Sequence, residues 1–201
     1  LPTARPEPTF TLPFTPGPTP TALGSGGALA FSLRRNGNTD IYALNQETRR
    51  LVRLTHHPAE DRSPTWSPDG DYLAFASNRA DNWDIYLLDL VSGSLIRLTR
   101  HAEFDGHPSW SPDGQWLAFE SYRQGNLDVY VMGTRGDEIQ RVTSDPAADF
   151  APAWTGDGRA LAFTSLRRGS KDIYLRLLEG QEEVVNVTQS PDVDEDKPAW
   201  S

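Results

Sequence analysis

A repeat of 44 residues is the feature that most restricts how this chain can fold. The tripeptide Asp-(Ile/Val)-Tyr recurs at this interval, and the motifs Leu-Ala-Phe, (Leu/Val)-Thr and Pro-x-Trp-(Ser/Thr) keep the same period, slipping by only a residue or two in the last unit. The aspartates are Asp40, Asp84, Asp128 and Asp172, and the tryptophans are Trp66, Trp110, Trp154 and Trp200. Four motifs with one period predict four copies of a single structural unit that stack on one another.

Each unit contains four short β-strand candidates separated by turn signals. In the second unit they are residues 64–67, 72–77, 84–89 and 95–99. The turn Ser67-Pro-Asp-Gly70 separates the first two, because proline presets one turn dihedral and glycine tolerates a positive φ. No stretch has helical periodicity with caps. The pattern predicts an all-β protein, a β-propeller of four four-stranded blades.

The phase of the repeat predicts how the ring closes. The first unit lacks a Pro-x-Trp-Ser strand before Leu29, and the chain ends on a spare one, residues 198–201. We therefore expect the C-terminal strand to complete the first blade, which would bury Trp200. Two alternatives stay open: a fragment of a larger ring, and two chains that join into an eight-bladed one.

Residues 1–23 form a different region, rich in proline and threonine, whereas the propeller is expected over residues 24–201. Proline at this density favours extended conformers, so the region is predicted to be a spacer or a docking tail. Its apolar residues Phe10, Leu12 and Phe14 alternate as in a strand laid on a sheet edge. We expect this tail to dock on a neighbouring copy and to link propellers into an oligomer or a filament; docking on its own ring is the alternative.

Composition excludes several classes of function. The net charge of −9 disfavours nucleic acid and anionic membrane surfaces as partners. There is no cysteine, and no apolar run is long enough for a transmembrane helix, so no direct membrane insertion is expected. Because the chain starts at Leu1, we expect it to be processed or partial.

The repeat resembles a known family. The run Asp-x-x-Pro-x-Trp-Ser-Pro-Asp-Gly at residues 61–70, followed by Leu-Ala-Phe-x-Ser-x-Arg at 73–79 and Asp-Ile-Tyr at 84–86, is similar to the WD-like repeat of TolB propellers. Members of that family are periplasmic scaffolds of six blades that bind partner peptides and an envelope lipoprotein. The resemblance implies an extracytoplasmic bacterial protein, periplasmic, at the cell surface or extracellular.

The repeated charged residues are predicted to be structural. Arginine lies five residues before each repeated aspartate, so the two can pair across a hairpin turn. Occurrence in all four units favours bracing over catalysis, since a catalytic pair is needed once. The arginines are Arg35, Arg79, Arg123 and Arg167. The four Pro-x-Trp tryptophans are likewise assigned to the core.

Histidines and aspartates gather in the loops between units, where they are expected to surround one mouth of the channel. A metal site there is conceivable, but exposed loop residues are the favoured interpretation, so no metal is predicted. These residues are His57, Asp61, His101, Asp105, His107 and Asp149. The acidic run Asp192, Asp194, Asp196 lacks the glycine and glutamate of a calcium loop and is predicted to be an acidic turn.

Together these observations predict a protein-binding scaffold with no cofactor and no catalytic residue, because no nucleophile elbow, zinc motif or phosphate loop is present. The expected partner is a protein, either another copy or an envelope component. Two alternatives remain: an accessory propeller of a larger peptidase-type enzyme, and a sensor that binds a small ligand at the channel mouth.

Overall fold

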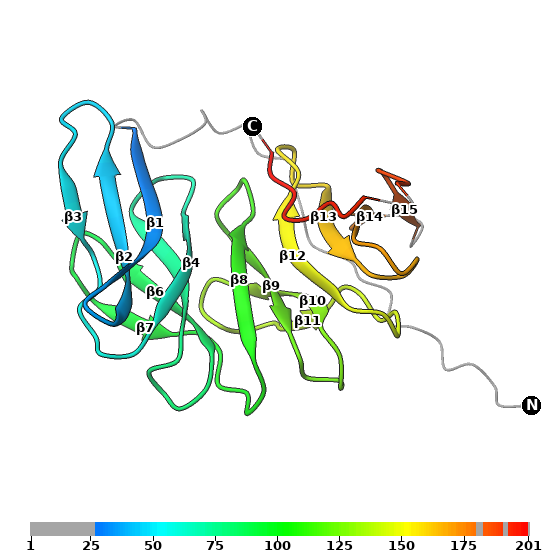
Figure 1. Ribbon diagram of the computed structural model, residues 1–201, viewed down its shortest axis with the longest axis horizontal. Helices are drawn as coiled ribbons and strands as arrows, with labels where there is room; N and C mark the ends of the chain where they lie inside the picture. Colours follow the sequence, from blue (N-terminus) through cyan, green and yellow to red (C-terminus); the bar gives the residue numbers. More distant parts are fainter. Residues whose placement is uncertain (1–26, 180–182, 191–192, 201) are drawn as a thin grey trace, which may run out of the picture.

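The computed structural model describes residues 27–179, 183–190 and 193–200, and every regular element within these ranges is a β-strand. The strands form four antiparallel sheets that follow one another in chain order across the molecule (Figure 1). This confirms the prediction of an all-β propeller with four blades. The first blade contains β1 (Ala28–Arg35), β2 (Asn38–Asn45) and β3 (Leu51–Arg53).

The other three blades each have four strands. The second contains β4 (Asp61–Trp66), β5 (Tyr72–Ser77), β6 (Asp84–Asp89) and β7 (Leu95–Arg97). The third contains β8 (Asp105–Trp110), β9 (Trp116–Ser121), β10 (Asp128–Gly133) and β11 (Gln140–Arg141). The fourth contains β12 (Asp149–Trp154), β13 (Ala160–Ser165), β14 (Asp172–Leu177) and β15 (Val184–Asn186).

Each sequence motif has a local structural reason. In the turn after β4, Gly70 has φ of 80°, a conformation that glycine adopts without steric cost. The threonine of the (Leu/Val)-Thr motif binds the backbone of the Asp-(Ile/Val)-Tyr strand of its blade. In the second blade the Thr99 hydroxyl oxygen accepts a hydrogen bond from the Ile85 amide at 2.9 Å. The same bond joins Thr55 to Ile41 and Thr143 to Val129. The motif therefore links the third strand of each blade to the segment that leaves it.

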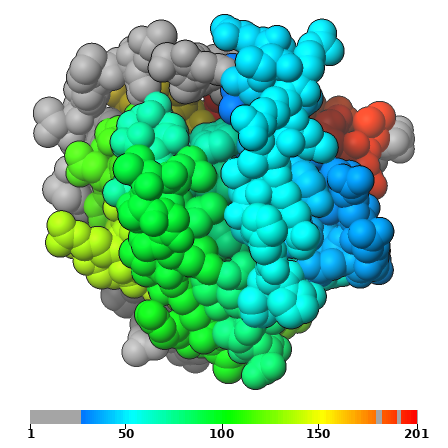
Figure 2. Space-filling view, turned by 90° about the vertical axis from the view of Figure 1, so that its left-hand side faces the viewer, coloured from blue at the N-terminus to red at the C-terminus, as the bar shows by residue number. Residues whose placement is uncertain are grey.

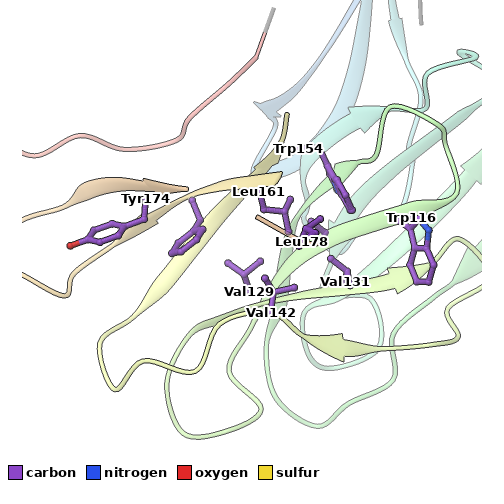
Figure 3. Packing of buried hydrophobic residues seen from close by; sticks show 10 residues of the cluster. Trp116, Val129, Val131, Val142, Trp154, Leu161, Tyr174 and Leu178 are labelled. Atoms are coloured by element: carbon purple, nitrogen blue, oxygen red, sulfur yellow. The ribbon is translucent and has the colours of Figure 1, made fainter. Parts of the chain in front are cut away.

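The hydrophobic core lies between blades. At each junction the Leu-x-Phe side of one blade packs on the aliphatic side of the blade before it. Phe119 and Leu117 of the third blade share one buried cluster with Ala74 and Ile85 of the second. Figure 3 shows the next junction, where Trp154 and Leu161 of the fourth blade meet Val129, Val131 and Val142 of the third. A lone blade leaves both faces bare, so stacking is what stabilises the fold.

The predicted ring closure is not found. Among the described residues the first sheet has three strands, and residues 193–200 form no strand. This segment lies on the fourth blade, where the Lys197 amide donates to Thr164 Oγ1 at 3.1 Å, while the first blade lies at the other end of the arc (Figure 1). Trp200 is consequently 55% exposed. The closure prediction is wrong because the four stacked blades form an arc that leaves the first and last blades apart.

Candidate functional site: the inner groove

The first strands of the blades, β4, β8 and β12, line a groove together with residues 197–200. We call it the inner groove; its volume is about 700 Å³, which is in the range of ligand pockets. The Pro-x-Trp motif supplies most of its wall: Pro64 and Trp66, Pro108 and Trp110, Pro152 and Trp154, and Pro198 and Trp200. The repeat therefore produces a wall rich in proline and indole side chains, suited to an apolar or extended ligand.

A β-bulge turns the backbone of each inner strand toward the preceding blade. The pairing of β4 with β5 shifts between Arg62 and Thr65, and the intervening Ser63 has φ of 51°. His107 and Ala151 occupy the same position in β8 and β12, with φ of 44° and 51°. A non-glycine residue in this region is strained, so three repetitions indicate that the fold maintains the conformation.

One carboxylate joins two of these bulges. Glu120 on β9 is buried, and its Oε1 lies 2.7 Å from His107 Nδ1. Its Oε2 accepts a hydrogen bond from the Ala151 amide at 2.8 Å. Ser32 holds the corresponding place in the first blade and accepts from the Ser63 amide at 3.2 Å. Glu120 thus connects the third blade to the fourth and holds the His107 ring, which lines the inner groove.

Sequence reasoning missed Glu120. The signal was a single carboxylate at a position that the other units fill with Ser32, Ala76 and Thr164. A repeat makes such a departure visible, because every other unit serves as its reference. His107 was predicted in a loop but lies on β8 instead.

The aspartates predicted at the channel mouth are not available to a ligand. Asp61, Asp105 and Asp149 are the first residues of β4, β8 and β12, and all three are fully buried. The prediction was wrong because each carboxylate is enclosed by its own blade and bound to an arginine. His57 and His101 are exposed, and their backbone carbonyls accept hydrogen bonds from Asn38 and Asn82. Within the part of the chain that the structure describes, no group of three or more His, Asp and Glu residues could hold a metal ion.

The predicted pairing of arginines with aspartates across the hairpin is also wrong. Arg79 binds both carboxylate oxygens of Asp61, at 2.9 and 3.0 Å, and its guanidinium lies 4.9 Å from the Tyr86 ring centre. Asp84 instead pairs with Arg97 at 2.7 Å. Arg123–Asp105 and Arg167–Asp149 repeat the first pair, and Arg53–Asp40 and Arg141–Asp128 repeat the second. Adjacency along a hairpin did not decide the pairing, because in the second, third and fourth blades the inner strand brings a second carboxylate to the arginine.

Burial shifts the pKa of Asp128. It raises the pKa of this carboxyl to about 6 from its ordinary value of 3.8, although Arg141 at 2.7 Å opposes the shift. Burial also raises the pKa of Asp84 and of Asp149. None of these three carboxylates is among the residues that line the inner groove.

We expect acid to stabilise the fold through Asp128. The raised pKa means that the native state binds this proton more tightly than the unfolded chain, so the free energy of unfolding rises as the pH falls from 7 toward 4. The contribution is about 1 kcal/mol between pH 7 and pH 5. Urea unfolding at both pH values should show that Asp128→Asn lacks this gain. An equal pH dependence in the variant would contradict the assignment.

Comparison with known proteins identifies the family. The model of the TolB beta propeller domain matches residues 18–105, 67–145 and 85–201. The chain therefore belongs to the TolB β-propeller family. No curated protein matches it by sequence.

Solved structures agree with this membership. TolB from Acinetobacter baumannii is 30% identical with a TM-score of 0.74, and the match covers 81% of this chain and 41% of that one. A putative TolB from Agrobacterium tumefaciens is 26% identical with a TM-score of 0.71, covering 80% and 60%. The chain thus spans about half the length of these relatives. A puromycin-hydrolysing peptidase of Mycobacterium tuberculosis, at 18% identity and a TM-score of 0.58 over 83% of this chain and 31% of that one, shows the fold alone.

Proposed function

We propose that this chain is a non-enzymatic, extracytoplasmic scaffold that binds an extended segment of a partner protein in the inner groove. The observation that carries the proposal is the fourfold Pro-x-Trp wall, which repeats one set of side chains along a groove of about 700 Å³. A peptide presents a repeating backbone, so a repeating wall can contact successive residues in similar ways. Membership of the TolB propeller family supports a role in protein binding and a location outside the cytoplasm.

The chemistry of the groove indicates the kind of peptide. Tryptophan and proline side chains offer apolar surface with little conformational entropy to lose, which favours binding of aromatic and aliphatic residues. His107 and Lys197 are the charged or ionisable residues among those that line the groove in the described part of the chain. A peptide with apolar residues flanking a carboxylate fits this combination. The predicted tail docking through Phe10, Leu12 and Phe14 lies outside the described residues and stays a proposal.

No specific observation favours the other two functions. The structural likeness to peptidases, at 18% identity, shows the fold alone. Of the residues assigned to a ligand-sensing channel mouth, the aspartates are buried in ion pairs. Among the described residues, no helix is long and apolar enough to cross a bilayer.

Filling the groove tests the proposed function. Peptides selected from a random library on the purified chain should bind Ser109→Trp at least about tenfold more weakly, because Ser109 lines the groove and an indole there occupies it. The matched control is Ser92→Trp, since Ser92 is an exposed residue of the β6–β7 turn. Isothermal titration of the selected peptides provides the comparison. Failure to select any peptide, or equal binding to both variants, would overturn the proposal.

A further inference from the structure

The two ends of the arc expose side chains whose counterparts inside the arc are buried or, at Leu54, partly buried. Leu29 in the first blade is 53% exposed, whereas its counterparts Leu73, Leu117 and Leu161 are fully buried. At the other end Val187 is 57% exposed, whereas its counterparts Leu98 and Val142 are buried. Figure 2 shows the first blade, in blue and cyan, at the surface of the molecule beside the second blade, in green. Each end therefore presents a blade face without a neighbour among the described residues.

The junctions inside the chain show what covers such faces. Three times, the Leu-x-Phe side of one blade packs on the aliphatic side of the preceding blade. The fourth blade presents the aliphatic side, with Ile173, Leu175 and Val187, and the first blade presents the Leu-x-Phe side, with Leu29 and Phe31. The exposed faces are thus the two halves of a junction that this chain already forms three times.

Residues 193–200 resemble an inner strand in their backbone, although they belong to no sheet among the described residues. Lys197 has φ of 57°, as the bulged residues of β4, β8 and β12 do, and its amide contacts the fourth blade as Ser63 contacts the first. Residues 193–200 therefore have the bulge of an inner strand and its position on the preceding blade. They pair with no β-strand among the described residues, and β1 has a partner, β2, on one edge only.

Charge is complementary between the two ends. Residues 193–200 contain three carboxylates and one lysine, whereas residues 27–53 contain five arginines and two carboxylates. Opposite charges at the two ends favour their association and disfavour the association of two like ends.

We propose that two copies of this chain join head to tail into a closed ring of eight blades. The fourth blade of each copy packs on the first blade of the other, and residues 193–200 of each copy supply the inner strand of the partner's first blade. Two copies leave no blade face or inner strand without a partner. Propellers typically have four to eight blades, so two copies give a ring within the typical range and three would exceed it. This inference is independent of peptide binding in the inner groove.

Hydrodynamic measurements on the whole chain test the proposal. Sedimentation velocity should show the mass of two 22.3-kDa copies, in equilibrium with one copy at high dilution. Val187→Asp and Leu29→Asp should each weaken association at least about tenfold, because each places a carboxylate in both apolar junctions of the ring. The matched control Val91→Asp changes a valine that is exposed on the β6–β7 turn, and it should leave association unchanged.

A mixing experiment keeps the test independent of folding defects. When Val187→Asp and Leu29→Asp copies are mixed, one junction of the mixed ring contains both substitutions and the other contains neither. Association should therefore recover in the mixture relative to either variant alone, which only a head-to-tail contact produces. Deletion of residues 1–17 should leave the two-copy mass unchanged, which separates this contact from assembly through the tail.

Several results would overturn the proposal. The first is a single-copy mass at every concentration, as expected if the chain closes on itself. The others are equal association of the Val187→Asp and Val91→Asp variants, and no recovery of association on mixing. Loss of peptide binding by Ser109→Trp with the two-copy mass retained would show that the groove can be blocked without breaking the junctions between copies.

Discussion

Replacement of Phe119 by alanine is expected to lower the free energy of unfolding by about 3–5 kcal/mol. Phe119 is fully buried at the junction of the second and third blades, and its ring centre lies 5.8 Å from that of Tyr130. Its removal leaves a cavity lined by side chains of two sheets. The hydrogen-bonded backbone of each sheet is rigid, which limits how closely the two sheets can approach. Because the surroundings cannot collapse into that cavity, we expect a loss in the upper part of the range. Urea unfolding followed by tryptophan fluorescence measures it.

The repeat supplies a control for this prediction. Phe31→Ala removes the same side chain from the same position of the first blade, where the phenylalanine is only partly buried. Measured in the Val187→Asp background, in which the proposed partner is weakened, the loss should be less than half that of Phe119→Ala. Equal losses would contradict the finding that the first blade has an uncovered face.

Replacement of Asp105 by alanine is expected to cost about 3–5 kcal/mol. Asp105 is fully buried, and Arg123 Nη2 lies 2.8 Å from its carboxylate. Loss of the carboxylate leaves a guanidinium that is itself largely buried, stacked 5.2 Å from the Phe119 ring centre, without its counter-ion. Glu60→Ala is the control, because its partners Arg34 and Arg62 are 67% and 52% exposed, so these ion pairs should contribute at most about 1 kcal/mol. Thermal and urea unfolding of both variants provide the comparison.

A double-mutant cycle decides the pairing itself. The coupling energy between Arg123→Ala and Asp105→Ala should be on the order of 1–3 kcal/mol, whereas that between Arg123→Ala and Asp128→Ala should be clearly smaller. The reverse result would restore the pairing that the hairpin spacing suggested. The cycle is informative because both aspartates are buried and each has an arginine partner.

The same inner strands serve stability and the proposed binding site. Trp110 donates a hydrogen bond from Nε1 to the Thr65 carbonyl at 3.2 Å, so one indole both joins two blades and lines the inner groove. Groove shape therefore depends on how the blades stack. If two copies close a ring, the grooves of both copies face one axis, and peptide affinity should rise with the concentration of the protein itself.

The strands were predictable because their signals are local. The turn Ser67-Pro-Asp-Gly70 and the alternation on either side of it fix where β4 ends and β5 begins, and β5 and β6 agree with the predicted ranges. The inner strand was predicted to start at Pro64 but starts at Asp61, since the bulge at Ser63 interrupts its pairing. A bulge has no strong sequence signal when its residue is not glycine.

The candidate site was predictable only in part. The Pro-x-Trp repeat indicated residues of one kind at equivalent places, and these residues do line one groove. The role of Glu120 was not predictable, because its contacts with His107 and Ala151 join residues 13 and 31 positions away through the stacking of two blades.

By itself the sequence determined the number of units, the class of fold and the side chains that fill each junction, because all of these follow from a repeat read within one unit. Only the tertiary structure decided which arginine binds which aspartate, which residue holds the groove together, and whether the first and last blades meet. These depend on the angle between stacked sheets. That angle is set by side-chain packing summed over several junctions, and no single unit encodes it.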